Sequence, residues 1–398
     1  MKSKLLGSIL IIAGSSIGGG MLAMPITSAG VGFIGTTLLL GVIWFAMCYT
    51  ALLMVDLYDY NDASAGFNTL TKKYAGSFIN KLAGFSLMFL IYGLTAAYIS
   101  GGGTIIKTNI DLLFDTNFNT YTAILLFALV FGGIVIIGTQ WVDWLTRGIF
   151  IAKLIFLVLL VVLLFPFVKQ ANLLHSPLSV GLTISAIPAI FTSFGFHGSI
   201  PSIVQYLDGD KKRLKRAFIL GSLLPLVVYL IWQIVVLGSL DQLLFMQILQ
   251  ENSGLRGLIM SIREISHSPH VETLFSLFAA TGLGTSFLGV SIGLFDYYKD
   301  VFKVKNNPAF ITSVAGILTF IPPLLFALFY PEGFILALGY AAIAGVILAL
   351  FIPQYLYIKA MAYHNKRISL GQGSLMAFIF LLAALIIVAQ IRIALGHY

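Results

Sequence analysis

Two short stretches interrupt the apolar segments of this chain, and together they decide its fold. The first is Ser15-Ser16-Ile17-Gly18-Gly19-Gly20-Met21, and the second is Phe191-Thr192-Ser193-Phe194-Gly195-Phe196-His197-Gly198-Ser199-Ile200-Pro201. Inside a helix, glycine costs about 1 kcal/mol relative to alanine. Pro25 lies just beyond the first stretch and Pro201 ends the second, and a proline inside a helix removes a backbone hydrogen bond. Both stretches therefore predict a helix that is broken in its middle.

The segments around these breaks are long and apolar. Of the 398 residues, 59% are hydrophobic and only 10% are charged, and the mean hydropathy is +0.99. A soluble domain carries about 25% charged residues, so the solvent of this chain must be largely lipid. Helices satisfy their own backbone groups in lipid. Eleven apolar runs are long enough to cross a bilayer as helices, at residues 5–27, 33–55, 82–106, 121–139, 148–168, 182–206, 217–238, 271–295, 309–329, 333–356 and 374–395.

Composition excludes several classes of function. The single cysteine, Cys48, permits no intrachain disulfide, and no cluster of metal ligands is present in the sequence. The net charge of +8 comes from short loops between apolar runs, which does not indicate nucleic-acid binding. An intramembrane enzyme would need catalytic groups at depth, and no carboxylate lies in the middle of a run. We therefore expect no enzyme, no metal, no cofactor and no nucleic-acid partner.

The distribution of Lys and Arg predicts the topology. A cytoplasmic N-terminus places 17 of these 23 residues inside and five outside, with Lys153 within a span. The positive-inside rule then predicts that the C-terminus is outside the cytoplasm. A cleaved signal peptide is the other interpretation of the first span, but the glycine run and the apolar continuation to Pro25 favour a working helix.

The two breaks occupy matching places in the chain. They lie in spans one and six, which begin two halves of five spans at about residues 5–168 and 182–356, with an extra helix at about 374–395. Because five is odd, the second half is inverted in the membrane. Broken spans at corresponding places predict a transporter's central site, whereas an ion channel would more naturally have repeated pore loops. We expect one transmembrane domain over residues 1–398.

The chemistry of such a site suits an amino acid. Amide groups at the start of a half-helix favour a carboxylate, and carbonyl groups freed by the break can accept hydrogen bonds from an ammonium group. The alternative is that glycine merely permits close helix packing. We favour that interpretation for Gly101-Gly102-Gly103 and for Gly282 and Gly284, but not for the two breaks.

One segment between spans, residues 241–270, is long enough for structure of its own. Within it Leu255, Leu258, Ile259, Ile262 and Ile265 recur at helical spacing. Two interpretations stay open: a helix that lies on the bilayer surface, and a cap over an outward vestibule.

The second break and its flanks closely resemble the hydroxy/aromatic amino acid permease family. The matching residues run from Ala186-Ile187-Pro188 through the break to Tyr206-Leu207-Asp208-Gly209, with further agreement at Ser268-Pro269-His270-Val271-Glu272, Thr285-Ser286-Phe287-Leu288-Gly289-Val290, Gly293-Leu294-Phe295-Asp296-Tyr297 and Phe329-Tyr330-Pro331. The resemblance implies a leucine-transporter-like fold in the amino acid–polyamine–organocation superfamily. It also implies proton-coupled symport of an aromatic amino acid across the bacterial inner membrane. The tyrosine-specific members look most similar; a tryptophan permease and a sodium-coupled carrier are the alternatives. The oligomeric state stays open.

The resemblance also assigns residues to the site. The glycine run matches the carboxylate-binding turn of the superfamily, and Ser16 lies where a carbonyl group meets the amine. Many relatives have a serine where this chain has Gly19, so any contact there must be through the backbone. Residues 191–194 would line the pocket for the substrate side chain. The predicted substrate-binding residues are Ser15, Ser16, Ile17, Gly18, Gly19, Gly20, Phe191, Thr192, Ser193, Phe194 and Gly195.

Two ionisable residues lie well inside the spans, where such groups are candidates for function. Lys153 is six residues past Arg147, about 9 Å deeper along a helix. It either snorkels to the cytoplasmic surface or places its ammonium where sodium-coupled relatives hold sodium, facing Thr285 and Ser286. A desolvated ammonium gives up its proton more readily, so Lys153 is a candidate proton carrier. His197 either titrates or satisfies carbonyl groups of the broken helix.

Overall fold

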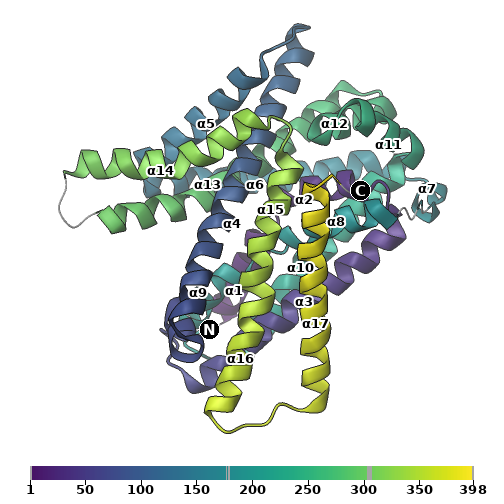
Figure 1. Ribbon diagram of the computed structural model, residues 1–398. Helices are drawn as coiled ribbons and strands as arrows, with labels where there is room; N and C mark the ends of the chain where they lie inside the picture. Colours follow the sequence, from purple (N-terminus) through teal and green to yellow (C-terminus); the bar gives the residue numbers. More distant parts are fainter. Residues whose placement is uncertain (1, 176, 178–179, 303–306, 397–398) are drawn as a thin grey trace.

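The structure is a computed structural model that describes residues 2–175, 177, 180–302 and 307–396, and within them every regular element is a helix (Figure 1). The helices are α1 (Lys2–Ser16), α2 (Gly20–Ser28), α3 (Gly32–Leu57), α4 (Phe67–Phe114), α5 (Thr120–Ile137), α6 (Thr139–Leu164), α7 (Gln170–Leu174), α8 (Val180–Thr192), α9 (Ile200–Tyr206), α10 (Lys211–Ser239), α11 (Gln242–Glu251), α12 (Gly254–Ser266), α13 (Pro269–Phe302), α14 (Pro308–Phe329), α15 (Phe334–Val346), α16 (Ile352–Tyr363) and α17 (Leu370–Ala394). A π-helical segment, Ile347–Phe351, joins α15 to α16.

The eleven predicted spans are present in the described residues. Ten helical segments are long and apolar enough to cross a membrane, and the pair α1–α2, bent by 51°, supplies the eleventh. Span six consists of α8, a 3-10 turn at His197–Ser199 and α9. Both predicted breaks are therefore present, and Pro201 lies in the first turn of α9, where its missing N–H costs nothing.

Span three is longer than its apolar run. The predicted segment 82–106 belongs to the 48-residue helix α4, whose backbone leaves helical geometry at Gly76 with φ +79°. Only glycine adopts that φ readily, so the kink separates a short N-terminal arm from the long apolar helix. The arm is too polar to show in a hydropathy profile, which explains why the prediction starts later.

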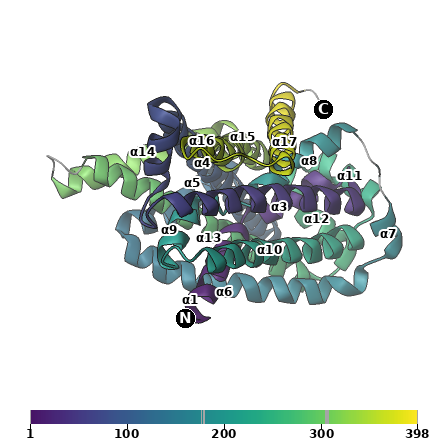
Figure 2. The same cartoon turned by 90° about the horizontal axis from the view of Figure 1, so that it is seen from below.

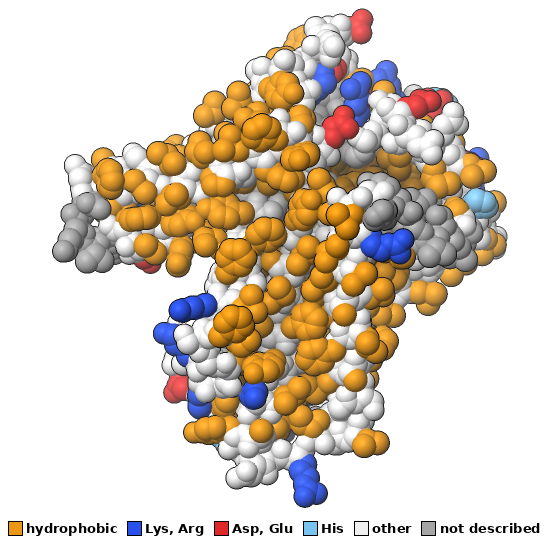
Figure 3. All heavy atoms as spheres, in the orientation of Figure 1, with side chains coloured by type: hydrophobic (Ala, Val, Ile, Leu, Met, Phe, Trp, Pro, Cys, Tyr) orange, Lys and Arg blue, Asp and Glu red, His pale blue; other side chains and the backbone are white. Residues whose placement is uncertain are grey.

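The outer surface of the helices is apolar. Large side chains such as Leu38, Leu129 and Leu381 are about 70% exposed, and the face in Figure 3 is mostly hydrophobic, with charged side chains gathered toward its ends. In water such a surface would aggregate, whereas in a bilayer it faces lipid tails. The exposed apolar surface agrees with the prediction that lipid is the main solvent.

The broken helices lie at the centre of the molecule. α2 packs against α8, α1 packs against α10, and α10 lies beside α3 (Figure 2). On the other side, α13 packs against α6 and α4, and α15 packs against α4 and α8. Thus α4, α6, α10, α13 and α15 surround the two breaks.

Residues 241–270 form α11 and α12, and the apolar stripe of α12 faces protein. Leu255, Leu258, Ile259 and Ile262 are all buried, and α12 packs against α2, α4 and α13. The structure therefore favours the cap over the bilayer-surface helix, and this cap covers the end of α2.

Most of the glycines assigned to packing do serve it. A Cβ at Gly284 would lie 2.7 Å from the Phe131 ring, and Cβ atoms at Gly102 and Gly103 would overlap Phe127 and Ile124. Gly282 departs from the prediction, because the nearest atom to its Cβ position is Lys153 Cδ at 3.9 Å.

Candidate functional site

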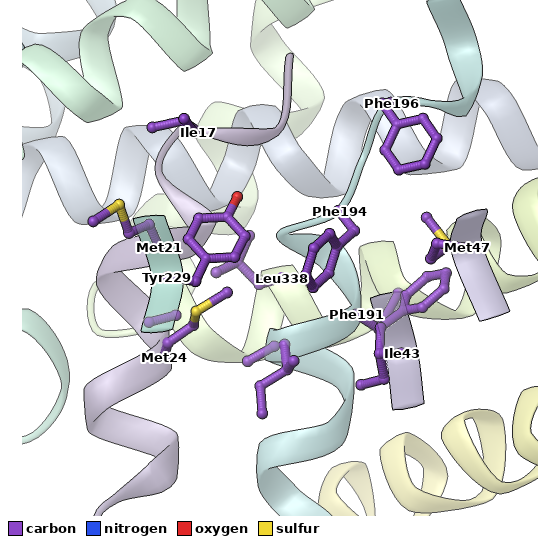
Figure 4. Packing of buried hydrophobic residues seen from close by; sticks show 14 of the residues in the cluster. Ile17, Met21, Met24, Ile43, Met47, Phe191, Phe194, Phe196, Tyr229 and Leu338 are labelled. Carbon is purple, nitrogen blue, oxygen red and sulfur yellow. The ribbon is translucent and has the colours of Figure 1, made fainter. Parts of the chain in front are cut away.

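The two helix breaks lie side by side. A Cβ built on Gly20, the first residue of α2, would lie 3.1 Å from Cα of Ser193, which follows α8 directly. Figure 4 shows the Tyr229 ring between Met21 of the first break and Phe194 of the second. The predicted partnership of the breaks is therefore present in the geometry.

Residues 18–20 of the first break, here called the glycine turn, have backbone amide groups that can bind a ligand. The amide of Gly19 donates to Ser286 Oγ at 2.9 Å, and the amides of Met21 and Leu22 donate to the carbonyls of Gly18 and Gly19. Within the described part of the chain, the amides of Gly18 and Gly20 have no acceptor. Two backbone donors thus remain at the positive end of α2, where an anion is favoured.

Space at the turn requires glycine. A Cβ at Gly19 would lie 2.6 Å from Tyr98 Cε1 and 3.2 Å from Leu283 Cδ2, and the Tyr98 hydroxyl hydrogen-bonds with Ser286. Tyr98 is not among the residues predicted for the site, because a tyrosine in a long apolar run carries no signal of the direction in which its side chain points. Its ring now forms one wall of the glycine turn.

The serines of the first break turn back to their own helix. Ser15 Oγ and Ser16 Oγ both donate to the carbonyl of Ile12, at 2.8 and 3.3 Å. Their hydroxyl protons are therefore used within the helix, and the Ser15 and Ser16 side chains have only acceptor lone pairs left for a ligand. The Ser16 carbonyl, predicted to meet an amine, accepts a hydrogen bond from Tyr229 Oη at 2.6 Å.

Lys153 lies where the sequence placed it, against the first break. Its side chain is only 3% exposed, and its Nζ donates to the Ile17 carbonyl at 2.7 Å and to Thr285 Oγ1 at 3.4 Å. Nζ also lies 4.7 Å from the centre of the Phe150 ring. Among the ion pairs of the described residues, none includes Lys153. The snorkelling alternative is therefore wrong: the ammonium is buried and links the first break, α6 and α13.

His197 lies apart from this cluster. Its Nε2 is 2.9 Å from Thr50 Oγ1 of α3, and its ring stacks on Phe196 at 4.9 Å. Thr50 Oγ1 also lies 3.1 Å from two backbone carbonyls of α3, so either Thr50 or the Nε2 tautomer of His197 can supply the proton of this pair. The bond ties the second break to α3, and His197 meets a threonine rather than the carbonyls of the broken helix.

A cavity of about 330 Å³ adjoins the second break. Its walls include Phe191, Thr192, Gly195 and His197, with apolar side chains of α3, α4, the π-helical segment and α16 opposite them, and Asn68 and Asn80 among its polar groups. Ligand cavities of this size accept small organic molecules. The glycine turn is not part of its walls.

The prediction for residues 191–194 holds only in part. Phe191 and Thr192 line the cavity, but Ser193 and Phe194 do not. Ser193 Oγ donates to the Ala189 carbonyl at 2.9 Å, and the fully buried Phe194 packs edge-on against Tyr229, with ring centres 5.3 Å apart. Beyond the helix end the backbone turns away from helical geometry, so helical spacing does not predict which side chains face the cavity.

Comparison with known proteins identifies the fold and the family. The chain superimposes on a crystal structure of MhsT in complex with L-phenylalanine with a TM-score of 0.60, at 16% identity, over 99% of this chain and 98% of that one. This match confirms the leucine-transporter-like fold.

The sequence comparisons agree on a transport protein. The tyrosine-specific transport system 1 of Haemophilus influenzae is 42% identical, over 97% of this chain and 96% of that protein. The tryptophan-specific transport protein of the same organism is 33% identical, over 99% of this chain and 97% of that protein. These relatives are transporters, as the sequence predicted, and not enzymes. The model of the tryptophan/tyrosine permease family matches residues 1–391, and the chain, a multi-pass membrane protein, belongs to that family.

Proposed function

We propose that this protein imports an aromatic amino acid, tyrosine in first place, together with protons across the inner membrane of a bacterium. The higher identity to a tyrosine-specific system than to a tryptophan-specific one supports tyrosine. The excess of Lys and Arg in alternate loops supports a cytoplasmic N-terminus and a periplasmic C-terminus. Tryptophan is the second candidate, because tryptophan-specific relatives match over equal lengths.

The site suits the backbone groups of an amino acid. The amides of Gly18 and Gly20 would receive the carboxylate, and the carbonyls of Ser16 and Ser193 would meet the ammonium group. The aromatic ring would lie toward the cavity beside Phe191 and Thr192, where the walls are mainly apolar. Such an arrangement selects an amino acid by its zwitterion and an aromatic one by its side chain.

Proton coupling rests on the position of Lys153. Its ammonium bridges a carbonyl of the first break and a hydroxyl of α13 in a buried place, and among the described residues no carboxylate pairs with it. While protonated, Lys153 holds the first break, α6 and α13 together. When the proton leaves toward the cytoplasm, the neutral amine binds these oxygens less strongly, and the first broken helix can move. Proton and substrate fluxes then become linked.

The two halves of the chain support one transporter unit. We infer that residues 5–168 and 182–356 are the inverted repeats of a single domain, that the helix at residues 374–395 is an addition, and that lipid surrounds it. Each half begins with a broken span, α1–α2 and α8–α9, and the two breaks pack together. That contact is what an inverted repeat places at the bilayer midplane.

The test is tyrosine uptake into proteoliposomes under an imposed pH gradient without sodium. Lys153→Gln should abolish accumulation while substrate binding persists, and Lys153→Arg should be nearly as damaging because arginine keeps its proton. His197→Gln tests the other candidate carrier, to which the role would pass if that variant alone failed, and a sodium gradient without a pH gradient tests the sodium-coupled alternative. Accumulation by Lys153→Gln at the parental rate would exclude this lysine as the carrier.

A further inference from the structure

Two carbonyl groups freed by the helix breaks converge on one side chain. Tyr229 of α10 is fully buried, and its hydroxyl oxygen lies 2.6 Å from the carbonyl oxygen of Ser16 and 2.6 Å from that of Ser193. Figure 4 shows its ring between Met21 of the first break and Phe194 of the second. One hydroxyl therefore joins the two broken spans at their open ends.

This hydroxyl supplies fewer protons than the carbonyl pair can accept. A phenol has a single O–H, so it fully satisfies one carbonyl at a time or is shared between two. A buried carbonyl that lacks a donor raises the free energy of the state that contains it. An ammonium group has three N–H donors and would serve both oxygens together. The geometry at Tyr229 is therefore that of a substitute for a better donor.

The ammonium of an amino acid can reach this place. The Ser16 carbonyl belongs to the same turn as the amides of Gly18 and Gly20, which have no acceptor among the residues that the structure describes. The ammonium and carboxylate groups of an α-amino acid are attached to the same Cα, so a single molecule can contact both sets of groups. The Ser193 carbonyl then supplies the contact from the second break.

We propose that the Tyr229 hydroxyl occupies the ammonium position in the empty transporter and yields the Ser16 and Ser193 carbonyls to the substrate. Tyr229 is then a positioning residue that keeps both breaks aligned without substrate and competes with the incoming ammonium group. This inference rests on the proposed function, because it takes the ligand to be an amino acid held at the two breaks.

The decisive variant is Tyr229→Phe in the purified full-length protein. Without this hydroxyl the two carbonyls lack a donor in the empty state, whereas in the bound state the substrate ammonium still serves them. The empty state is therefore destabilised relative to the bound state, and the affinity for tyrosine should rise about fivefold or more. The comparison ligand is 3-(4-hydroxyphenyl)propionate, which keeps the ring and carboxylate of tyrosine but lacks its ammonium group. Its affinity should not rise in the variant.

Tyr92→Phe is the matched control. Tyr92 also donates its phenol proton to a backbone carbonyl, that of Leu318 at 2.7 Å, but it does so away from the breaks. The affinity of this variant for tyrosine and for the amine-free compound should equal that of the parent protein. If Tyr229→Phe proves too unstable to purify, 3-fluorotyrosine at position 229 keeps the hydroxyl. Its fluorine resonance should then shift with tyrosine and not with the amine-free compound.

Three results would overturn the role of Tyr229. Weaker tyrosine binding by Tyr229→Phe would mean that the hydroxyl contacts the substrate directly. Equal changes for tyrosine and the amine-free compound would indicate a structural bond alone, as would an unshifted fluorine resonance. A parent protein that binds neither tyrosine nor tryptophan would instead contradict the proposed function.

Discussion

Gly19 is the position where a single methyl group should separate transport from folding. Its φ of −58° and ψ of −29° are accessible to any residue, so only space demands glycine there. In Gly19→Ala the new Cβ would lie 2.6 and 3.0 Å from Tyr98 Cε1 and Cδ1, and 3.2 Å from Leu283 Cδ2. Carbon atoms pack at about 3.5–4.0 Å, so the closest contact is about 1 Å too short.

The size of the effect follows from that overlap. Tyr98 is buried, which leaves its ring little room to retreat, and overpacking of this kind costs about 1–3 kcal/mol. If the turn must hold its shape to bind a carboxylate, that cost falls on the bound state. The specificity constant for tyrosine uptake should then drop about 5- to 150-fold. Gly19→Val, with two more methyl groups, should abolish transport.

The assay is initial-rate tyrosine uptake in proteoliposomes, with the thermal unfolding midpoint of each purified variant measured in parallel. Gly133→Ala in α5 is the matched control, because nothing lies within 4 Å of its Cβ position. This control should transport normally. Gly19→Ala with parental uptake kinetics would refute the assignment of the glycine turn. An equally large loss in Gly133→Ala would show that the assay reports helix substitution in general.

Two further predictions concern specificity and topology. Tryptophan and phenylalanine should compete with tyrosine for uptake, whereas lysine and glutamate should not. Among the described residues, the cavity walls contain no Asp, Glu, Lys or Arg that could pair with a charged substrate side chain. Equal inhibition of tyrosine uptake by charged amino acids would contradict this specificity. In a Cys48→Ser background, Asn252→Cys should react with an impermeant maleimide added outside intact cells. Lys366→Cys should react only after the membrane is opened. The reverse pattern would invert the proposed topology.

The features that could be predicted from the sequence are those that depend on neighbours along the chain. Three glycines in succession weaken a helix wherever it lies, so the first break was predictable, as was the second from its glycines and Pro201. The depth of Lys153 follows from its distance along the helix from Arg147. Its contact with Thr285 was expected only from the family resemblance, and the structure has both groups together.

The features that could not be predicted are contacts between spans. Tyr98 and Tyr229 form the wall of the glycine turn and the link between the breaks, yet each lies in an apolar run without any local signal. The cavity beside Phe191 and the burial of Phe194 likewise depend on helices far away in sequence.

The physical reason is the solvent. In a soluble helix the polar face meets water and the apolar face meets the core, so periodicity reveals which side packs. In a bilayer the lipid-facing and protein-facing sides are both apolar. The sequence by itself therefore determined where this chain crosses the membrane and where its helices break. Only the tertiary structure decided which faces meet, and with them which tyrosine hydroxyl lies against the freed carbonyls.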